Sequence, residues 1–239
     1  MQGFLLINKP AGMTSHDVVN RIRKFTGEKC VGHAGTLDPF ATGLLITGVG
    51  RGATKEMNRF VGLDKTYEAV FILGAQSDTD DKDGHIEPVP LKIIPQNREI
   101  LEKILLQFTG ELEQIPPTYS AIKVGGKKMY EAARAGKPIE GKPRKVTIYS
   151  IELINTSTVA LGAMVDKPTL SLKIHCSSGT YIRAIARDLG KVLGGGGYVE
   201  ELKRTSIGPF SLDQSHELES LKETVEQALI PVEKLIECL

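Results

Sequence analysis

The order of strand-like and helix-like segments sets the limits on the fold of this chain. "GFLLINK" and "ATGLLITGVG" are apolar runs of strand length, and "KTYEAVFILGA" alternates like a half-buried strand. "RKVTIYSIELINT" and "TLSLKIHC" are two further strand-like segments that adjoin in the sequence. Because parallel βαβ units alternate strands strictly with helices, this order predicts an α+β fold around a mixed, mostly antiparallel sheet flanked by helices and loops.

Helical segments are expected between and after these strands. A run with apolar residues at helical spacing begins at a Thr14 or Ser15 cap and stops near Gly27. The segment "YVEELKRTSIGPF" is expected to begin helical and to end extended, and "SHELESLKETVEQAL" is expected to be a terminal helix. Strands and helices therefore mix without an internal repeat.

Composition places the chain among ordinary soluble proteins. Of its 239 residues, 41% are hydrophobic and 25% are charged, and the length suffices for one large domain or two small ones. The opening apolar run is interrupted by Asn8, Lys9 and Pro10, so no signal peptide is expected, and no run is long enough to cross a membrane. The three cysteines are far apart, which predicts reduced cytoplasmic thiols and neither a disulfide framework nor a zinc site.

Charge is distributed unevenly, although the formal net charge is only +1. Residues 208–239 hold seven acidic and two basic residues, whereas residues 117–147 hold eight basic and two acidic ones. A locally basic strip is the footprint expected for a phosphate-rich partner. From charge alone, a solvated surface rich in lysine is the simpler interpretation.

Neither a metal site nor a phosphate-binding loop stands out. The five histidines are scattered without ligand spacing, and "SDTDDKDGH" lacks the glycine and glutamate positions of a calcium loop, which favours a mobile, solvated turn. "GVGRGA" formally fits the G-x-G-x-x-A pattern of a dinucleotide-binding turn. A dinucleotide-binding enzyme is therefore a second function class, although tight helix entry explains these glycines more simply.

The stretch "CVGHAGTLDPFATGLLITGVG" displays a single carboxylate, Asp38, before a proline and among small residues. Turn chemistry is the usual reason for such an aspartate. Two other positions weaken that interpretation, because Arg183 is expected in the first turn of a helix and Tyr67 at the start of a strand. The three side chains could converge from element ends, but their spacing alone does not bring them together.

"GHAGTLDPFATGLL" closely resembles the catalytic motif of pseudouridine synthases of the tRNA pseudouridine synthase B (TruB) type. Four further motifs match in order: "LLINKPAGMTSHDVV", "KTYEAVFILGAQSDTDDKDG", "IPPTYSAIKVGGKKMYEAARAG" and "HCSSGTYIRAIARDLG" followed by "YVEELKR". The resemblance implies a pseudouridine synthase catalytic domain over residues 1–210. It also implies an isomerase that converts uridine 55 in the TΨC loop of tRNA to pseudouridine with no metal and no cofactor.

The resemblance assigns the catalytic roles to Asp38, Tyr67 and Arg183. Asp38 would be the nucleophile, with attack at the sugar C1′ and attack at the base C6 both open. Arg183 would pair with the carboxylate and aim it, and Tyr67 would stack on the uracil and could help to remove the C5 proton. A surface arginine and an aromatic residue packed in the core are the ordinary alternatives for the last two.

Substrate binding is assigned by the same resemblance to His33, Tyr67, Tyr181 and Leu202. A base inside a folded RNA loop must be flipped out to be reached, and His33 would brace the vacated stack. Tyr181 and Leu202 would line the uracil pocket. Each of these residues alone would also pass for an ordinary loop or core residue.

The basic segment at about residues 117–147 resembles the part of these enzymes that folds against RNA. Lys123, Lys127, Lys128 and Arg134 would contact phosphates of the tRNA T-arm without reading sequence. A monomer is expected, with no membrane partner. Residues 211–239 are expected to be a short acidic helical segment, too short for a full RNA-binding domain of the PUA type.

Two other functions stay open beside the dinucleotide-binding enzyme. The protein could be an RNA-binding protein that helps tRNA to fold, with catalysis secondary, since flipping and refolding a loop allows this. It could also use a guide RNA, as archaeal and eukaryotic relatives of the family do, although the sequence shows no surface for partner proteins.

Overall fold

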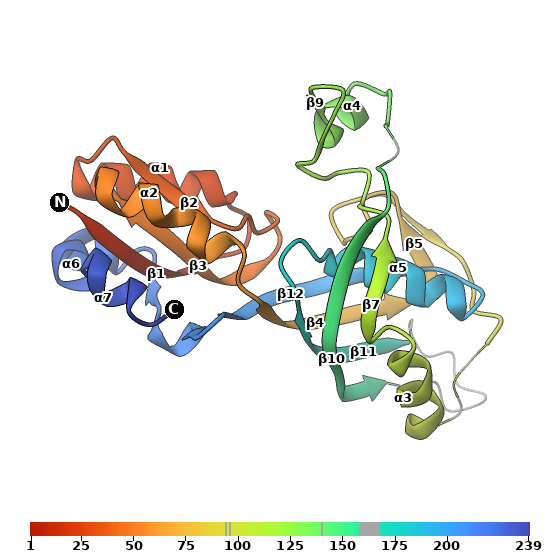
Figure 1. Ribbon diagram of the computed structural model, residues 1–239. Coiled ribbons are helices and arrows are strands. Elements are labelled where there is room, and N and C mark those ends of the chain that lie inside the picture. The colour runs from red at the N-terminus through yellow and green to blue at the C-terminus, as the bar shows by residue number, and fades with distance from the viewer. Residues whose placement is uncertain (94, 96, 140, 158–167) are drawn as a thin grey trace. The chain divides into compact units, whose positions relative to one another are not determined.

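The computed structural model describes residues 1–93, 95, 97–139, 141–157 and 168–239, which divide into two compact units (Figure 1). The first unit comprises Met1–Tyr67 and Leu202–Leu239, and the second comprises Glu68–Glu201. The chain passes between them within two strands, β4 (Lys65–Leu73) and β12 (Gly197–Ile207).

Strands and helices of the first unit come from both ends of the chain. Besides its parts of β4 and β12, they are β1 (Gly3–Lys9), α1 (Ser15–Thr26), β2 (Val31–Ala34), β3 (Thr42–Val49), α2 (Gly50–Val61), β13 (Phe210–Ser211), the 3-10 turn η1 (Leu212–Gln214), β14 (His216–Glu217), α6 (Leu221–Ala228) and α7 (Val232–Ile236). The strands are neighbours in the order β14-β1-β3-β12, with β2 paired to β3 and β13 to β12.

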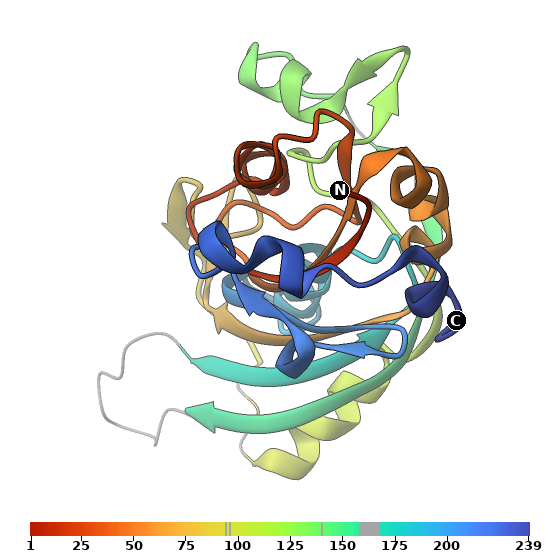
Figure 2. The ribbon, with the colours of Figure 1, turned by 90° about the vertical axis from the view of Figure 1, so that its left-hand side faces the viewer.

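Strand β1 carries the core of the first unit on both of its faces, because successive side chains point to opposite sides of a sheet. Phe4 and Leu6 pack with residues of α2 and α7, whereas Leu5 and Ile7 pack with residues of α1 and α6. Figure 2 shows the two pairs of helices on the two sides of β1. The continuous apolar run predicted as a strand is thus buried on both faces.

Helix α1 begins and ends as its sequence predicts. The Thr14 side chain accepts from the Asp17 N–H at 3.0 Å, and the Asp17 carboxylate accepts from the Thr14 N–H at 2.9 Å, so the two form a capping box. Gly27 ends the helix with φ +68°, the left-handed conformation that glycine adopts without steric cost.

The second unit is a sheet with helices packed against it. Its strands and helices are β5 (Ala75–Ser77), β6 (Ile86–Pro88), α3 (Arg98–Leu106), β7 (Gly110–Gln114), β8 (Lys123–Val124), β9 (Lys127–Lys128), α4 (Met129–Arg134), β10 (Arg144–Ser157), β11 (Thr169–Cys176) and α5 (Ile182–Val192). The main sheet runs β12-β4-β11-β10-β7, and two short hairpins, β5-β6 and β8-β9, lie outside it.

Strand directions confirm a mixed sheet in an α+β fold. β1 pairs with β3, β10 with β11 and β10 with β7 in antiparallel fashion, whereas β1 with β14 and β3 with β12 are parallel. The parallel pair β3–β12 requires a glycine at Gly43, because a Cβ there would lie 2.3 Å from the Arg204 carbonyl oxygen and φ is +104°. The backbones of these two strands therefore approach closely beside the catalytic motif.

Two of the expected helices are wrong in part. "YVEELKRTSIGPF" is extended from its first residue, since β12 begins at Gly197, and its buried Tyr198 and Val199 are residues that favour strands. "SHELESLKETVEQAL" is helical only from Leu221, because His216 and Glu217 pair with β1 instead. Periodicity alone cannot separate a strand buried on both faces from a buried helix.

The acidic C-terminal segment supplies part of the first unit's core. Leu218, Leu221 and Val225 pack against α1, and Val232 and Leu235 pack with Phe4 on the other face of β1. The segment is joined to β1 by mutual backbone hydrogen bonds between Phe4 and Ile230 at 2.8 and 2.9 Å. The predicted division into a catalytic domain of residues 1–210 and a short segment of residues 211–239 stays a prediction.

Replacing Leu221 by alanine should lower the free energy of unfolding by about 2–5 kcal/mol, because the side chain is fully buried and leaves a cavity. Lys222→Ala, at the exposed neighbouring position, is the matched control and should change it by less than about 0.5 kcal/mol. Urea denaturation measures both. Equal effects would mean that the segment does not pack as described.

Candidate active site

Asp38 lies in the loop of residues 35–41, which connects β2 to β3 in the first unit. Its carbonyl oxygen accepts from the Ala41 N–H at 3.1 Å, so the residue does form a turn. The loop is anchored on α1, because the Ser15 hydroxyl donates to the Leu37 carbonyl at 3.2 Å and accepts from the Leu37 N–H at 2.9 Å. The backbone of Asp38 can therefore form a turn while its side-chain carboxylate serves another role.

A buried lysine ties this loop to the N-terminal strand. The Lys9 ammonium donates to the carbonyl oxygens of Met13, Pro10 and Pro39 at 2.7, 2.8 and 3.2 Å, and the side chain is fully buried. Burial lowers the pKa of Lys9 to about 8, while the negative charge of Asp38 raises it and Arg204 lowers it. Lys9 and Asp38 therefore interact electrostatically.

Arg204 supports the loop from the β12 side. Its Nε donates to the Leu44 carbonyl at 2.8 Å and its Nη2 to the Gly35 carbonyl at 3.1 Å, and it is 1% exposed. These acceptors lie on either side of Asp38 in the sequence. Neither Lys9 nor Arg204 was predicted as a functional residue, and the only signal in the sequence is that Asn8, Lys9 and Pro10 interrupt the opening apolar run.

His33 lies on β2 opposite Thr47 of β3 and is partly buried. Burial is the main cause that lowers its pKa, and the positive charges of Arg204 and His16 lower it further. Its Nδ1 is buried and has no hydrogen-bond partner among the described residues. The lowered pKa favours the neutral imidazole, whose aromatic ring could stack against a base.

Tyr67 and Leu202 also belong to the first unit, on β4 and β12. They are 9% and 7% exposed, so both side chains are buried, as expected for residues that pack in the core. Nearby, the Thr205 hydroxyl donates to the Thr66 carbonyl at 3.3 Å and links the same two strands. The first unit thus holds Asp38 together with three of the residues predicted to bind the base.

Arg183 and Tyr181 lie in the second unit, at the start of α5. Arg183 is 4% exposed, which rules out the surface interpretation, and it forms an ion pair with Asp81 at 3.0 Å. Its guanidinium also donates to the carbonyl oxygens of Thr79 and Tyr119 at 2.9 and 3.1 Å. The expected pairing of Arg183 with Asp38 stays a prediction.

Sequence reasoning missed Asp81, which it placed in a solvated turn. Both carboxylate oxygens are used, because Oδ1 accepts from the Thr79 hydroxyl at 2.6 Å and from the Asp83 N–H at 3.1 Å, while Oδ2 faces Arg183. A buried charge without a partner is costly, so the arginine and the aspartate require each other.

Tyr181 is held by a buried glutamine from β7. The Gln114 side-chain amide donates to the Tyr181 carbonyl at 3.0 Å, and its oxygen accepts from the Tyr181 N–H at 2.8 Å. This two-point contact fixes the backbone just before the helix that carries Arg183. Gln114 is a second positioning residue that the sequence did not reveal.

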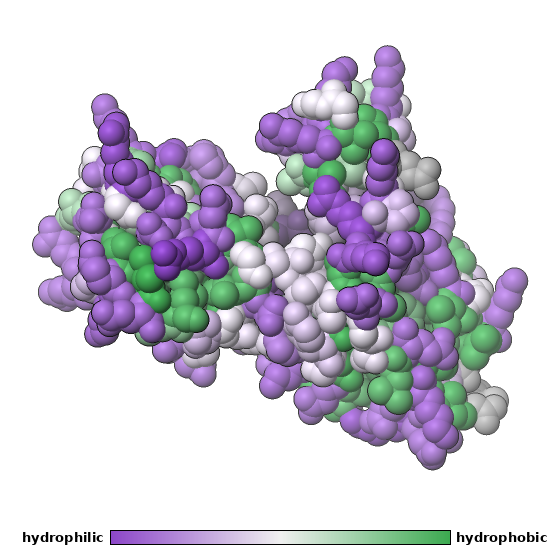
Figure 3. Space-filling view, in the orientation of Figure 1, coloured by the Kyte–Doolittle hydropathy of each residue, from purple (hydrophilic) through white to green (hydrophobic). Residues whose placement is uncertain are grey.

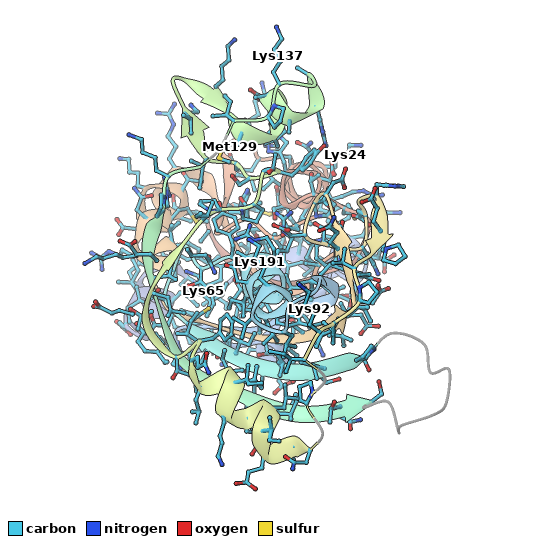
Figure 4. The ribbon with its side chains drawn as sticks, turned by 90° about the vertical axis from the view of Figure 1, so that its right-hand side faces the viewer. Lys24, Lys65, Lys92, Met129, Lys137 and Lys191 are labelled. Carbon is cyan, nitrogen blue, oxygen red and sulfur yellow. The ribbon has the colours of Figure 1, made fainter. Side chains whose placement is uncertain are left out.

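The basic segment forms the hairpin β8-β9 followed by α4. Lys123, Lys127 and Arg134 are exposed, and Lys128 is partly exposed with its ammonium 3.7 Å from Glu131 and 5.4 Å from the centre of the Tyr130 ring. Outward side chains here are mainly hydrophilic in Figure 3, and Lys137 extends away from the segment in Figure 4. Glu140, which contributes to the predicted charge of this strip, lies outside the described residues.

The glycine-rich turn after β3 is filled by the N-terminus. The Gly52 N–H donates to the Gln2 side chain at 3.3 Å, and a Cβ on Gly52 would lie 2.4 Å from Gln2 Nε2. Helix entry beside Gln2 accounts for these glycines, which argues against a bound dinucleotide.

The described part of the chain holds neither a cluster of metal-binding side chains nor a membrane-spanning helix. No group of three or more histidine, cysteine, aspartate or glutamate residues in this part of the chain is arranged to hold a metal ion. Within the same residues, no helix is long and apolar enough to cross a membrane.

The pKa of Lys9 gives a direct test of its interaction with Asp38. In the folded protein Lys9 should titrate near 8, and Asp38→Asn should lower that value because it removes the charge that raises it. Lysine-selective carbon NMR measures the titration, with exposed Lys24 as the internal reference. An unchanged Lys9 pKa in the variant would contradict the electrostatic contact.

The same shift predicts how stability depends on pH. Because the folded pKa lies below the unfolded value, the unfolded state binds more protons between about 8 and 10.5. The contribution of Lys9 to stability should therefore rise with pH across that window, and Lys9→Met should remove the rise. Chemical denaturation at a series of pH values measures it.

Family models and individual relatives both relate this chain to the same family of proteins. The TruB family pseudouridylate synthase (N terminal domain) matches residues 23–182, and the tRNA pseudouridylate synthase B C-terminal domain matches residues 183–237. The tRNA pseudouridine synthase B of Clostridium kluyveri is 44% identical over 237 residues, covering 99% of this chain and 78% of that protein. That of Arthrobacter sp. (strain FB24) is 40% identical over 245 residues, covering 99% and 78%.

Solved structures support the fold. The chain is similar to the crystal structure of a Cbf5-Nop10-Gar1 complex with a TM-score of 0.73 and 26% identity. The match covers 99% of this chain and 62% of the matched chain, so this chain spans less than two thirds of its length. The predicted pseudouridine synthase fold is confirmed.

Proposed function

The chain belongs to the TruB family of pseudouridylate synthases, and we propose that it isomerises uridine 55 in the TΨC loop of tRNA to pseudouridine. The observation that carries the proposal is the Asp38 loop, which is held by Lys9, Ser15 and Arg204 and displays its carboxylate beside buried positive charge. A carboxylate carried on a loop whose backbone is held in this way suits a nucleophile better than one on a solvated turn does.

The proposed reaction breaks the bond between N1 of uracil and C1′ of the ribose, turns the base, and rejoins it through C5. Asp38 is the nucleophile in this scheme, at C1′ of the ribose or at C6 of the base, and its bond to the substrate is broken again before the product leaves. Once C5 has joined C1′, C5 loses its proton and N1 gains one. No water has to be activated, so a single carboxylate with supporting groups suffices. No cofactor and no metal takes part in this scheme.

The other predicted residues fit supporting roles in this scheme. Arg183 would pair with the Asp38 carboxylate and orient it, and Tyr67 would stack on the uracil. Tyr181 and Leu202 would line the base pocket. His33 would occupy the space that the flipped base leaves in the RNA stack.

The basic hairpin and α4 would dock on the T-arm through its phosphates. Lys123, Lys127, Lys128 and Arg134 offer positive charge with little competition from acidic neighbours, apart from Glu131 beside Lys128. Such contacts position the RNA, while specificity would come from the shape of the loop and the flipped base. We propose that the protein acts in the cytoplasm as a monomer.

Replacing the proposed nucleophile tests the function. In Asp38→Asn, which keeps the size and removes the charge, pseudouridine formation at position 55 of an unmodified tRNA transcript should fall more than about a thousandfold. Asp213→Asn, at an exposed aspartate, is the matched control and should retain activity. Tritium release from 5-labelled uridine measures the rate, and a gel-shift assay measures binding.

The activity and binding results distinguish the proposed synthase from an RNA-binding protein that helps tRNA to fold. Full activity of Asp38→Asn would return Asp38 to a turn role and reject the mechanism. Wild-type protein that binds tRNA and speeds its refolding without making pseudouridine would favour the RNA-binding alternative.

Salt dependence tests the role of the basic segment. Lys127→Ala should weaken tRNA binding uniformly and reduce the slope of log K against log salt by about 1, because one phosphate contact is lost. Lys103→Ala, at an exposed lysine of α3 that pairs with Glu99, is the matched control and should leave the slope unchanged. Equal slopes for both variants would place the RNA elsewhere.

A further inference from the structure

The two arginines of α5 lie one helical turn apart and tie together the same two segments of the second unit. Arg183 joins α5 to the loop of residues 79–81, through Asp81 and the Thr79 carbonyl, and to the segment of residues 115–119, through the Tyr119 carbonyl. Each of these contacts is between 2.9 and 3.1 Å.

Arg187 repeats the arrangement one turn further along the helix. Its Nη1 forms an ion pair with Asp80 at 3.1 Å, and its Nη2 donates to the Ile115 carbonyl at 2.9 Å. Its Nε also donates to the neighbouring Asp188 at 2.9 Å, which fixes the guanidinium plane against α5. Asp80 therefore pairs with Arg187, and the next residue, Asp81, pairs with Arg183. Both arginines also donate to carbonyl oxygens of the segment of residues 115–119.

Asp80 has an unusual backbone that this contact helps to explain. Among the described residues it is the only non-glycine residue with positive φ, at 62°, a region that side chains with a Cβ disfavour. Its carbonyl oxygen accepts from the Val199 N–H of β12 at 3.1 Å, so the backbone is held from that side as well. The turn sends the side chains of Asp80 and Asp81 to different arginines.

The Asp80 carboxylate is also largely withdrawn from water. Burial raises its pKa, and the positive charges of Arg187 and Arg183 oppose that rise. An aspartate in such a place needs a cation to remain charged, and Arg187 is the cation that contacts it. The pair is thus not an ordinary surface ion pair, which would contribute little.

We propose that Asp80 and Arg187 are a positioning pair that sets the loop of residues 79–81 and the segment of residues 115–119, and thereby orients the guanidinium of Arg183 for catalysis. The inference rests on the proposed function, in which Arg183 aims the nucleophile. If either segment moves, an acceptor of Arg183 moves with it. Because a misplacement of about 1 Å can cost orders of magnitude in rate, a pair that touches no substrate can control the chemical step.

Conservative substitutions separate this role from simple folding. Asn tolerates the left-handed backbone and matches Asp in size, so Asp80→Asn removes only the charge, and Arg187→Gln removes the other partner. In both variants kcat for pseudouridine formation should fall about tenfold or more, while KM for tRNA should stay within about twofold. Arg187→Lys keeps the charge but cannot reach both acceptors, so it should recover part of kcat.

Two further variants supply the controls. Glu102→Gln breaks an exposed ion pair with Arg98 on α3 of the same unit and should leave kcat unchanged. The double variant Asp80→Asn with Arg187→Gln should be no slower than the slower single variant, because partners that act as a unit are not additive. Thermal unfolding checks that each variant is folded. If Asp80→Asn and Arg187→Gln are unfolded, the kcat of Arg187→Lys, which keeps the positive charge, serves as the test instead.

Unchanged kcat in the folded variants, a loss confined to KM, or additive losses in the double variant would each overturn the inference. Nitrogen NMR of arginine side chains in RNA-free protein tests the geometry without activity. The Arg183 signals should broaden in Asp80→Asn and stay sharp in Glu102→Gln, and sharp signals in both would reject the pair. Wild-type protein that makes no pseudouridine would instead reject the proposed function, while this NMR result still reports on the pair.

Discussion

A buried cation must find acceptors for its hydrogens, and in this protein most of the acceptors are main-chain carbonyl oxygens, many of them in loops. Lys9, Lys65, Arg183 and Arg204 are all 5% exposed or less, and each donates to at least two atoms of the chain. Leaving such a charge unpaired would cost several kcal/mol, so the loops cannot move away without a large penalty. In the loop of residues 35–41 these contacts add to the burial of Leu37 and Phe40 in holding the segment in place.

The consequence for function is preorganisation. The loop that displays Asp38 is fastened on three sides by side chains from β1, α1 and β12, none of which is adjacent to it in the sequence. In the second unit Arg183 is held in the same way by acceptors from two segments. The loop of the proposed nucleophile and the guanidinium of its proposed partner are each held within their own unit before RNA arrives, which lowers the binding energy needed to order either of them.

Sequence patterns predicted what depends on local chemistry and missed what depends on tertiary partners. The Thr14 capping box, the Gly27 stop and the strand β3 follow from residues next to one another, so they could be recognised. Lys9 and Arg204 could not, because lysine and arginine are on the surface by default and only a folded loop reveals their acceptors. The same limit applies to β12, whose first three residues are buried in succession, so that its sequence lacks the regular alternation that marks a strand.

The acidic turn shows why charge in a sequence is hard to interpret. Its run of aspartates has the composition of a solvated loop, yet Asp80 and Asp81 are 9% and 5% exposed and face arginines more than 100 positions away. An acidic cluster repels itself unless cations meet it, so its place in the fold depends on where those cations lie. Helix α5 presents its arginines four residues apart, which is one turn, and two consecutive acids can meet them only if the chain turns sharply between them. The left-handed backbone of Asp80 is therefore the local feature that makes both ion pairs possible at once.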